Sequence, residues 1–472
     1  MQYSELLEKQ IITRLRTDNP WWTEGCIPSY YAQMQPRPYF ERFYSLATDT
    51  DIDRAVVLMG PRRVGKTVML YHTIQRLIQQ GVNPQNIIYA SIETPLYLDV
   101  YLELIFNLAR RALGKDESNR NGRFYLFFDE IQYLKNWEIN LKSLVDTYKE
   151  CKFVVSGSAA AALRKGSSES GAGRFTDFML PPLTFYEYVN MKSYANILYK
   201  NNQDYYSAVD IEKLNTLFVD YINYGGYPEI VFSAKTRENT ELFIKHDIIE
   251  KVLLKDLPGI YGIADSQELN ALFSMIAFNS GGQFSYEKLA QQSGIKKDTL
   301  KKYIQYLEAS FLIRRVRRAD HTARNYKRES AFKIYLTNPS LRCALFKAVD
   351  SSDEFIGNMV ETAIFAQLNP NNQNIAYANW NSGGEGEVDL VTFNPATQQP
   401  DKLVEIKWTD KPFANPSILK SLEYFMENNS VTSAIVTSLT QQGTKQIQQG
   451  KLQFVPSACF AYTLGERYAK TL

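Results

Sequence analysis

Short, wholly apolar runs alternate with longer stretches of helical periodicity between Ala55 and about Ser158. The apolar runs are AVVLM (55–59), IIYAS (87–91), FYLFF (124–128) and FVVS (153–156). Between them lie TVMLYHTIQRLIQQ (67–80), a long stretch near LELIFNLARRAL, and WEINLKSLVDTY (137–148). Runs that are apolar on both faces are typical of strands buried in a parallel sheet. Their alternation with helices predicts a doubly wound α/β domain.

The periodicity changes in the remainder of the chain. From about 185 to 274 the pattern is mostly helical, and from about 279 to 346 it indicates a small module of helices and strands. The last segment, from about 350, returns to helix, strands and helix. A length of 472 residues is consistent with several domains of this kind.

Composition excludes several classes of protein. Lys plus Arg is 53 and Asp plus Glu is 51, so a net charge of +2 excludes a polycationic coat protein but not a local basic face. Four scattered cysteines and three histidines, without a CxxC pair, argue against a zinc site of the usual spacing and against a disulfide framework. The sequence shows no signal-peptide core and no membrane-spanning run, which predicts a cytoplasmic protein.

The clearest chemistry follows the first apolar run. Gly60, four further residues and Gly65-Lys66-Thr67 match the pattern GxxxxGK[ST], between a buried strand and an amphipathic helix. Such a loop turns its backbone N–H groups toward phosphate oxygens, and the helix N-terminus adds positive potential. We expect Lys66 to reach the β and γ phosphates of ATP and Thr67 to hold Mg²⁺. The predicted ATP-binding residues are Gly60, Pro61, Arg62, Arg63, Val64, Gly65, Lys66 and Thr67.

An acidic pair ends the third apolar run, about 60 residues beyond this loop. Parallel α/β sheets bind ligands at the carboxyl ends of their strands, so Asp129 and Glu130 are expected to face the nucleotide. Asp129 is the candidate Mg²⁺ ligand, and Glu130 is the candidate general base that polarises the attacking water. The predicted activity is Mg²⁺-dependent ATP hydrolysis.

GPRRVGKT together with FFDEIQ resembles the AAA-type (AAA+) P-loop ATPases, and more narrowly the bacterial and archaeal group with a C-terminal nuclease-like domain. The resemblance implies that Ser156 or Ser158, in FVVSGSAA (153–160), touches the γ-phosphate or the water. It implies that Arg174, in GRFTDFMLPPLTFYEY (173–188), senses the γ-phosphate, although a surface ion pair explains this residue equally well. It also implies that Pro228, in GGYP, faces the adenine, for which an ordinary turn is the alternative. Proteins of this type often form rings, which makes a homo-oligomer a possible state.

The middle module carries a basic segment. FSYEKLAQQSGIKKDTLKKYIQYLEASFLIRRVRR (284–318) has helix-turn-helix spacing, with an apolar core from its two helices and a turn at Ser293-Gly294. A basic strand pair follows, with seven basic residues against Asp320 between 314 and 328. A winged helix that binds double-stranded DNA through phosphate contacts explains this pattern, and a protein-contact module is the alternative. The candidate DNA-binding residues are Lys301, Lys302, Arg315 and Arg317.

The C-terminal segment places acids on neighbouring strands. NMVETAIFAQL (358–368) predicts a helix, and IAYANW (375–380), GEVDLVTF (386–393) and KLVEIKW (402–408) predict strands. Alternation puts Glu405 and Lys407 on one face, where Asp389 can join them. This arrangement resembles the PD-(D/E)xK nucleases, with Glu361 as the accessory acid, and implies a Mg²⁺ site. A solvated hairpin or a nuclease fold without activity is the alternative, because GEV stands where the name-giving Pro-Asp is expected.

These observations predict an α/β protein: a P-loop doubly wound parallel sheet with a helical lid, a winged-helix module and a C-terminal α/β nuclease-like domain. The expected parts are a helical collar (1–49), an AAA-type core (50–184), a helical lid (185–274), a winged-helix-like module (275–346) and a nuclease-like domain (347–472). KIYLTNPSLRCALF (333–346) resembles the bridge before the nuclease-like domain in this group, and we assign no chemistry to it. The expected function is an ATPase whose nucleotide state controls DNA engagement. The alternative is an ATP-gated signalling or assembly switch with an inactive nuclease-like scaffold.

Overall fold

The computed structural model describes residues 2–98, 100–114, 122–157, 173–200, 204–323, 331–369, 374–381 and 385–471. The chain divides into two compact units, one ending at Pro181 and the other running from Pro182 to Thr471. This division lies three residues before the predicted end of the AAA-type core. None of the helices within the described ranges is both long and apolar enough to cross a membrane.

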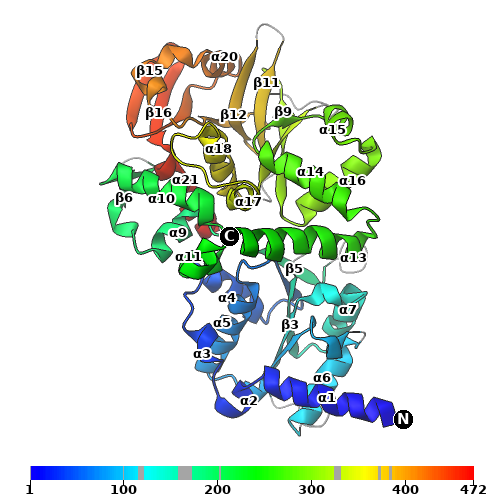
Figure 1. The fold of residues 1–472 in the computed structure, drawn as a ribbon. Helices are drawn as coiled ribbons and strands as arrows, with labels where there is room; N and C mark the ends of the chain where they lie inside the picture. Colours follow the sequence, from blue (N-terminus) through cyan, green and yellow to red (C-terminus); the bar gives the residue numbers. More distant parts are fainter. Residues whose placement is uncertain are drawn as a thin grey trace. The chain divides into compact units, whose positions relative to one another are not determined.

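The first unit is built around a five-stranded sheet in the order β2-β3-β4-β1-β5, with all neighbouring strands parallel. Helices α3, α4 and α5 lie on one side of the sheet and α6 and α7 on the other (Figure 1). Strands β1 and β2 have the predicted bounds, and every residue of β3 and β4 is buried. The bounds are α1 Gln2–Asp18, α2 Trp21–Glu24, α3 Ser29–Ala32, α4 Phe40–Thr48, β1 Ala55–Met59, α5 Lys66–Gln79, β2 Ile87–Ser91, α6 Leu102–Ala112, β3 Phe124–Asp129, α7 Trp137–Thr147, β4 Cys151–Gly157 and β5 Phe175–Met179.

The N-terminal helices close the open edge of this sheet at β2. The indole N–H groups of Trp21 and Trp22 both donate to the carbonyl oxygen of Ile87, at 2.9 and 2.8 Å. The side chain of buried Asn19 donates to the Tyr89 carbonyl and accepts from the Tyr89 N–H, at 2.8 and 2.7 Å. An exposed strand edge invites pairing with other chains, so these bonds satisfy groups that a sixth strand would otherwise use. The predicted collar therefore packs on the first unit.

The second unit begins with helices and ends in a large mixed sheet. Its first part contains α9 Phe185–Met191, β6 Leu198–Lys200, β7 Tyr206–Ala208, α10 Ile211–Tyr224, α11 Pro228–Phe232, α12 Ala234–Glu238, π-helical segments Glu241–Glu250 and Val252–Asp256, and α13 Leu257–Tyr261. The middle part contains α14 Ser266–Phe278, β8 Gln283–Phe284, α15 Tyr286–Ser293, α16 Lys297–Ala309, β9 Ile313–Ala319, β10 Phe332–Leu336 and α17 Ser340–Leu345. The last part contains α18 Ile356–Ala366, β11 Ile375–Trp380, β12 Gly386–Phe393, β13 Pro400–Glu405, α19 Lys411–Ala414, α20 Lys420–Asn428, β14 Ser433–Ser438, β15 Gly443–Ile447, β16 Gly450–Pro456 and α21 Ser457–Thr471.

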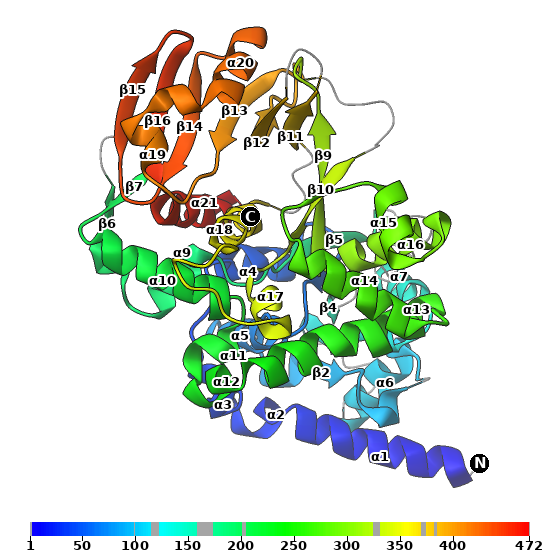
Figure 2. The same cartoon turned by 45° about the horizontal axis from the view of Figure 1, so that its top comes forward.

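One nine-stranded sheet runs through the middle and last parts, in the order β15-β16-β14-β13-β12-β11-β9-β10-β8. Strand β9 pairs antiparallel with β10 and parallel with β11, so it joins the two parts (Figure 2). The winged-helix-like and nuclease-like segments were expected as separate domains meeting at 346/347. The backbone hydrogen bonds of β9 place strands of both segments in one sheet, while a domain boundary at 346/347 stays a prediction.

Two apolar clusters cover the two faces of the C-terminal strands. Leu390 and Val404 pack with α18 and α21 on one face, whereas Val391 and Leu403 pack with α20 on the other. Neighbouring residues of β12 and β13 thus serve opposite faces, as the period of two in a strand requires. The middle of β12 and the end of β13 are buried, so Asp389 and Glu405 are charged residues within the buried parts of these strands.

Candidate functional site

The loop predicted to bind phosphate connects β1 to α5. Gly65 has φ of +97°, a left-handed conformation that glycine adopts without the strain of a Cβ. At Gly60 a Cβ would lie 2.2 Å from the carbonyl oxygen of Leu180, so only glycine permits this close approach. The two glycines of the motif are therefore required for different reasons, one for backbone conformation and one for packing.

Lys66 lies inside this loop rather than in solvent. Its side chain is buried, and its Nζ donates to the carbonyl oxygens of Gly60 and Pro61, at 3.1 and 2.8 Å. Arg37, from the N-terminal collar, braces the same loop by donating to the Val64 carbonyl at 2.8 Å and to the Pro181 carbonyl at 3.1 Å. Lys66 is thus held at the concave side of the loop, where it can exchange carbonyl partners for phosphate oxygens.

Asp129 ends β3 beside the start of α5 and collects three hydroxyl groups. Thr67 Oγ1 donates to its Oδ2 at 2.6 Å, Tyr89 OH donates to the same oxygen at 3.0 Å, and Ser156 Oγ donates to Oδ1. Burial, and next the charge of Glu130, raise the pKa of Asp129, although the hydroxyl donors act in the opposite direction. The structure therefore brings together three residues predicted separately, Thr67, Asp129 and Ser156.

The donor set at Asp129 suits a magnesium ion. Mg²⁺ prefers oxygen ligands and binds through one or two protein groups while keeping several waters. The Thr67 hydroxyl and the Asp129 carboxylate supply such oxygens side by side, at the carboxyl edge of the sheet. Glu130 follows with φ of +53° and a half-buried carboxylate that accepts from the Gln132 amide. Glu130 is thus adjacent in sequence to Asp129, but its carboxylate accepts from the Gln132 amide, whereas that of Asp129 accepts from the hydroxyl groups.

Arg174 lies at the opposite end of the sheet from the loop. Its carbonyl oxygen accepts from the N–H of Ala55, the first residue of β1, whereas the loop follows the last residue, Met59. Five strand residues rise about 16 Å, beyond the reach of an arginine side chain. Its Nε instead pairs with Asp146 at 2.5 Å. A contact of Arg174 with a nucleotide in its own chain is therefore excluded by geometry, and a contact across subunits stays a prediction.

Two further predictions are not decided by these contacts. Pro228 begins α11 in the second unit, and the preceding Gly226 packs against Asn338, which a Cβ would approach to 2.3 Å. This close packing explains the glycine, while the assignment of Pro228 to adenine stays a prediction. Ser158, the other candidate sensor, lies outside the described residues.

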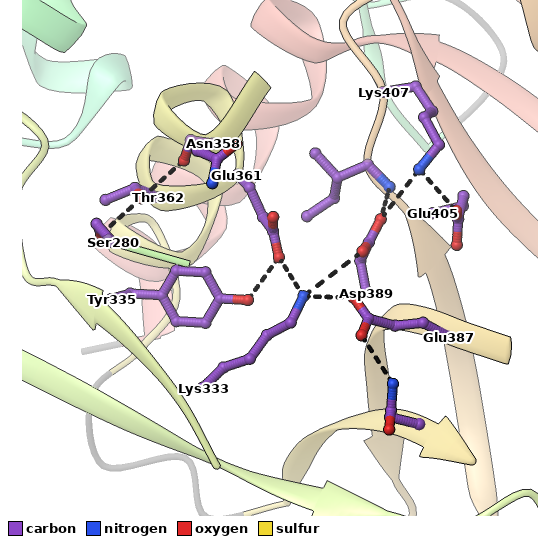
Figure 3. A network of polar contacts seen from close by, with 12 residues as sticks. Ser280, Lys333, Tyr335, Asn358, Glu361, Thr362, Glu387, Asp389, Glu405 and Lys407 are labelled. Atoms are coloured by element: carbon purple, nitrogen blue, oxygen red, sulfur yellow. Dashed lines mark hydrogen bonds and ion pairs between the residues drawn. The ribbon is translucent and has the colours of Figure 1, made fainter. Parts of the chain in front are cut away.

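A second group of predicted residues converges in the second unit. Glu405 closes β13, and its Oε1 is 2.7 Å from Lys407 Nζ, which lies 3.6 Å from Asp389 Oδ2. Asp389 also accepts from the N–H of Ile406 at 2.8 Å, which ties β12 to the end of β13. Glu361 projects from α18 toward the same place (Figure 3). The structure therefore brings Asp389, Glu405 and Lys407 into contact and places Glu361 beside them, while their role as a nuclease-like site stays a prediction.

The sequence analysis missed three members of this group. Lys333, on β10, has its Nζ 2.9 Å from Glu361 Oε1, 2.7 Å from Glu387 Oε1 and 3.8 Å from Asp389 Oδ1 (Figure 3). Tyr335, two residues further along β10, donates to Glu361 Oε1 at 2.6 Å. Glu387 is held by the Asn379 amide at 3.1 Å. We name this set, Lys333, Tyr335, Glu361, Glu387, Asp389, Glu405 and Lys407, the carboxylate centre.

A usable signal for Lys333 and Tyr335 was present in KIY. In a strand, residues i and i+2 point to the same face. Lys333 and Tyr335 therefore place two polar side chains on one face, and Ile334 points to the other face. The alternation of side chains along this strand, rather than the likeness of 333–346 to a family bridge, is therefore the signal for these two residues.

The carboxylate centre does not suit a divalent metal ion in this arrangement. Within the described ranges, no cluster of three or more His, Cys, Asp or Glu side chains is arranged to hold one. The acids are instead spaced by ammonium groups, with Lys333 between Glu361, Glu387 and Asp389. Of the side-chain atoms in the carboxylate centre, Glu405 Oε2 is buried without a hydrogen-bond partner among the described residues. The expected Mg²⁺ site at Asp389 and Glu405 is therefore not supported by the donor set.

Comparison with known protein families locates the first site within a defined domain. Residues 53–189 match the model of an AAA domain, and residues 215–352 match a domain of unknown function, DUF8612. The first match contains the 60–67 loop, Asp129 and Ser156, whose contacts are described above. Residues 53–189 form an AAA-type P-loop domain. The second match runs across the expected boundary at 274/275 and ends just before α18, so it does not describe the C-terminal strands.

Relatives of the chain extend beyond the AAA domain. An uncharacterized protein of Haemophilus influenzae is 25% identical over 323 residues, which cover 67% of this chain and 75% of that protein. Two uncharacterized proteins of Methanocaldococcus jannaschii, MJ1544 and MJ1637, are 23% and 24% identical over 365 and 392 residues. These matches cover 75% and 79% of this chain, and 76% and 79% of those proteins.

Solved structures give weaker similarities. The Orc1 protein of Aeropyrum pernix in complex with DNA has a TM-score of 0.30 and 13% identity, covering 71% of this chain and 97% of that chain. AMPPCP-bound DnaA of Aquifex aeolicus has a TM-score of 0.26 and 13% identity, covering 60% and 92%. Similarities at this level do not define the function of this chain.

Several arginines of the basic segment at 314–328 are bound to other parts of the chain, so fewer of them can contact DNA than the sequence indicated. Arg314 donates to three backbone carbonyls, and Arg318 Nε donates to the Asn379 carbonyl at 3.0 Å. Arg315 pairs with Glu308 at 3.2 Å and donates to the Tyr286 hydroxyl. These contacts argue against Arg315 as a DNA ligand.

The remaining basic candidates are on the surface. Lys302 on α16 and Arg317 on β9 are exposed, and Lys301 is half-buried beside Asp298 at 3.5 Å. Arg324, Lys327 and Arg328 lie outside the described residues. The apolar core predicted for the two helices of this segment is confirmed by the burial of Leu289, Ile295, Leu300, Ile304 and Leu307.

The carboxylate centre makes stability depend on pH. Burial, and next the charge of Asp389, raise the pKa of Glu405 from 4.5 to about 8, and the same two causes raise that of Glu361 to about 7. A raised pKa means that the folded state binds more protons, so this contribution is full below pH 4.5 and is lost as pH rises to about 8. We expect Glu405→Gln, which mimics the protonated acid, to stabilise the protein at pH 8 by a few kcal/mol relative to the parent.

The measurement is the thermal unfolding midpoint of the parent and the variant between pH 5 and 8. Glu427→Gln, at an exposed position on α20, serves as the matched control and should follow the parent at every pH. Parallel profiles for the parent and Glu405→Gln would contradict the expectation.

Proposed function

We propose that this protein is an ATP-binding, Mg²⁺-dependent ATPase. The observation that carries the proposal is the contact of Thr67 with Asp129 at the mouth of the 60–67 loop, with Lys66 held inside that loop. Lys66 and the loop amides would bind the phosphates, and Thr67 and Asp129 would hold the metal ion. The bound ion would neutralise charge on the phosphate oxygens.

Glu130 is the residue that we assign to the water. A general base must lie near the attacking water and keep an oxygen available to accept its proton. The Glu130 carboxylate accepts a hydrogen bond from the Gln132 amide through one oxygen, Oε2. Ser156 bonds to Asp129 and also lies 3.3 Å from the Glu130 N–H, so it links the metal ligand to the base. We therefore assign Ser156 to positioning these two acids.

We further propose that the nucleotide state controls engagement of double-stranded DNA by the middle part of the second unit. Its order of helices and strands, α14-β8-α15-α16-β9-β10, with β9, β10 and β8 as neighbouring strands at one end of the nine-stranded sheet, is that expected of a winged helix. The test is ATP turnover with and without duplex DNA, and an unchanged rate would remove the coupling while leaving the ATPase proposal intact.

We expect Lys302→Ala and Arg317→Ala to weaken DNA binding with little dependence on DNA sequence. Each phosphate contact that is lost should reduce the slope of log affinity against log salt by about 0.9. Fluorescence anisotropy with a labelled duplex at several salt concentrations measures this slope. Lys402→Ala, an exposed lysine on β13, is the control. Equal slopes for all four proteins would contradict DNA binding through this surface.

A second candidate function is an ATP-gated assembly switch with an inactive nuclease-like scaffold. The observation that favours it is the pairing of acids with lysines in the carboxylate centre, which argues against a divalent metal site within that centre. Size-exclusion chromatography with light scattering, in ADP and in a nonhydrolysable ATP analogue, tests this candidate. An unchanged mass in the two nucleotides would remove it.

A further inference from the structure

The carboxylate centre contains four acids and two lysines drawn from four separate elements. Glu361 comes from α18, Glu387 and Asp389 from β12, and Glu405 from the end of β13. Lys333 comes from β10, and Lys407 follows β13. Segments far apart in the sequence therefore place alternating negative and positive groups in one region (Figure 3).

The ammonium group of Lys333 lies among the carboxylates of this centre, at the kind of position that a bound metal ion takes. Its Nζ is within hydrogen-bond distance of Glu361 and Glu387, and the residue is 4% exposed. A buried ammonium is stable only when it is paired and hydrogen-bonded. The ring of Tyr377 lies 5.4 Å from the same nitrogen and adds favourable cation–π contact. The surroundings of Lys333 are thus built for a permanent cation.

The surrounding carboxylates keep the side chain of Lys333 charged. Burial by itself would lower the pKa of Lys333, but the charges of Glu361, Asp389 and Glu387 raise it well above its ordinary value. The lysine therefore stays charged throughout the physiological range of pH. Tyr335 donates to the same Glu361 oxygen that Lys333 binds, so this oxygen has two donors already.

A divalent ion at Asp389 would meet strong repulsion from this ammonium. An Mg²⁺ ion bound to Asp389 Oδ1 at about 2.1 Å would lie within about 6 Å of Lys333 Nζ, a separation at which charges in a protein interior interact strongly. Lys407, 3.6 Å from the other oxygen of Asp389, adds a second positive charge. Both oxygens of the central acid thus face cations that belong to the chain.

We propose that the ammonium of Lys333 takes the cation position of the carboxylate centre, so that this centre folds and persists without a divalent metal ion. Lys333 then links β10, which lies next to the edge strand β8, to α18 and β12. The inference concerns the second unit alone and stands whether or not the first unit hydrolyses ATP. It predicts that removing the ammonium converts the centre into a metal site.

The experiment measures Mn²⁺ binding to the full-length protein without nucleotide, from the loss of the free-ion signal in electron paramagnetic resonance. The parent and Asp389→Asn should bind the same amount of Mn²⁺, because the centre contributes none. Lys333→Met should gain one ion per chain, and Lys333→Met combined with Asp389→Asn should lose that gain. Lys402→Met, a lysine-to-methionine change on the exposed part of the same sheet, should gain none.

Two results would overturn the proposal. One is Mn²⁺ binding by the parent that disappears in Asp389→Asn. The other is a folded Lys333→Met protein that gains no ion. Should Lys333→Met unfold without metal and refold with Mn²⁺, a rise in its thermal midpoint with added Mn²⁺ counts as the predicted gain. Should it fail to fold in either buffer, the comparison of the parent with Asp389→Asn decides the question by itself.

Discussion

Lys66→Ala should reduce ATP turnover by at least about 10²-fold, the typical cost of removing a positioned donor that stabilises transition-state charge. The lysine lies between the Gly60 and Pro61 carbonyls and is buried in the loop. Arg62, a neighbouring cation of the loop, is instead held by the Tyr133 hydroxyl, to which it donates at 2.9 Å. Steady-state phosphate release at saturating ATP and Mg²⁺ measures the effect.

Two companion variants separate binding from chemistry. Glu130→Gln keeps the loop and the metal ligands, so it should bind ATP as the parent does while losing turnover. Lys135→Ala, at an exposed position, is the control for loss of a lysine in the same unit and should keep the parental ATP affinity and turnover. Isothermal titration with ATP and Mg²⁺ gives the affinities. Parental turnover in Lys66→Ala would refute the assignment of the 60–67 loop to ATP.

Arg314→Met should lower the free energy of unfolding by about 3 kcal/mol, which is large for a residue that reads as a surface base in the sequence. Its guanidinium donates to the carbonyls of Leu368 and Asn369 at 3.0 and 3.1 Å, and to that of Phe365 at 3.5 Å. The Phe365 carbonyl lies in the last turn of α18 and the other two lie just beyond it, where a helix has unpaired acceptors and a negative dipole end. Methionine keeps the apolar stem but supplies no donor, so several acceptors would lose their partner.

Arg317→Met is the matched control for this effect. It removes an arginine from the same strand at an exposed position, where substitutions usually change stability by less than about 0.5 kcal/mol. Urea unfolding followed by circular dichroism measures both variants. Equal midpoints for Arg314→Met and Arg317→Met would show that the carbonyl contacts of Arg314 do not stabilise the second unit.

The AAA domain could be predicted because its signals are local. The bounds of β1 and β2 follow from apolar runs, and the loop chemistry follows from eight consecutive residues, 60–67. Asp129 was predicted from its place at a strand end, and parallel pairing of β3 with β4 then brings Ser156 to it. In this domain each functional residue is next to the element that positions it, so periodicity and motif spacing are sufficient.

Arg174 shows where this reasoning stops. The family likeness named the residue, but the end of the sheet on which it lies is set by the pairing of Ala55 with Phe175. A sequence does not state whether a residue at a strand's beginning faces the ligand edge. The direction and register of β5 decide this, and both depend on its hydrogen bonds to β1.

The amino-acid sequence by itself indicated β1 to β4 and β11 to β13, the phosphate-binding type of loop, the acidic end of β3 and the placement of Asp389, Glu405 and Lys407 on one face. Only the tertiary structure decided that β9 joins two expected domains into one sheet, that Arg314 and Arg315 have internal partners, and that Lys333 stands among three acids. The physical reason is distance along the chain. Periodicity reports which face a residue occupies, whereas the partner of a charge across 28 or more residues, as for Lys333 and Glu361, is set by packing and strand order.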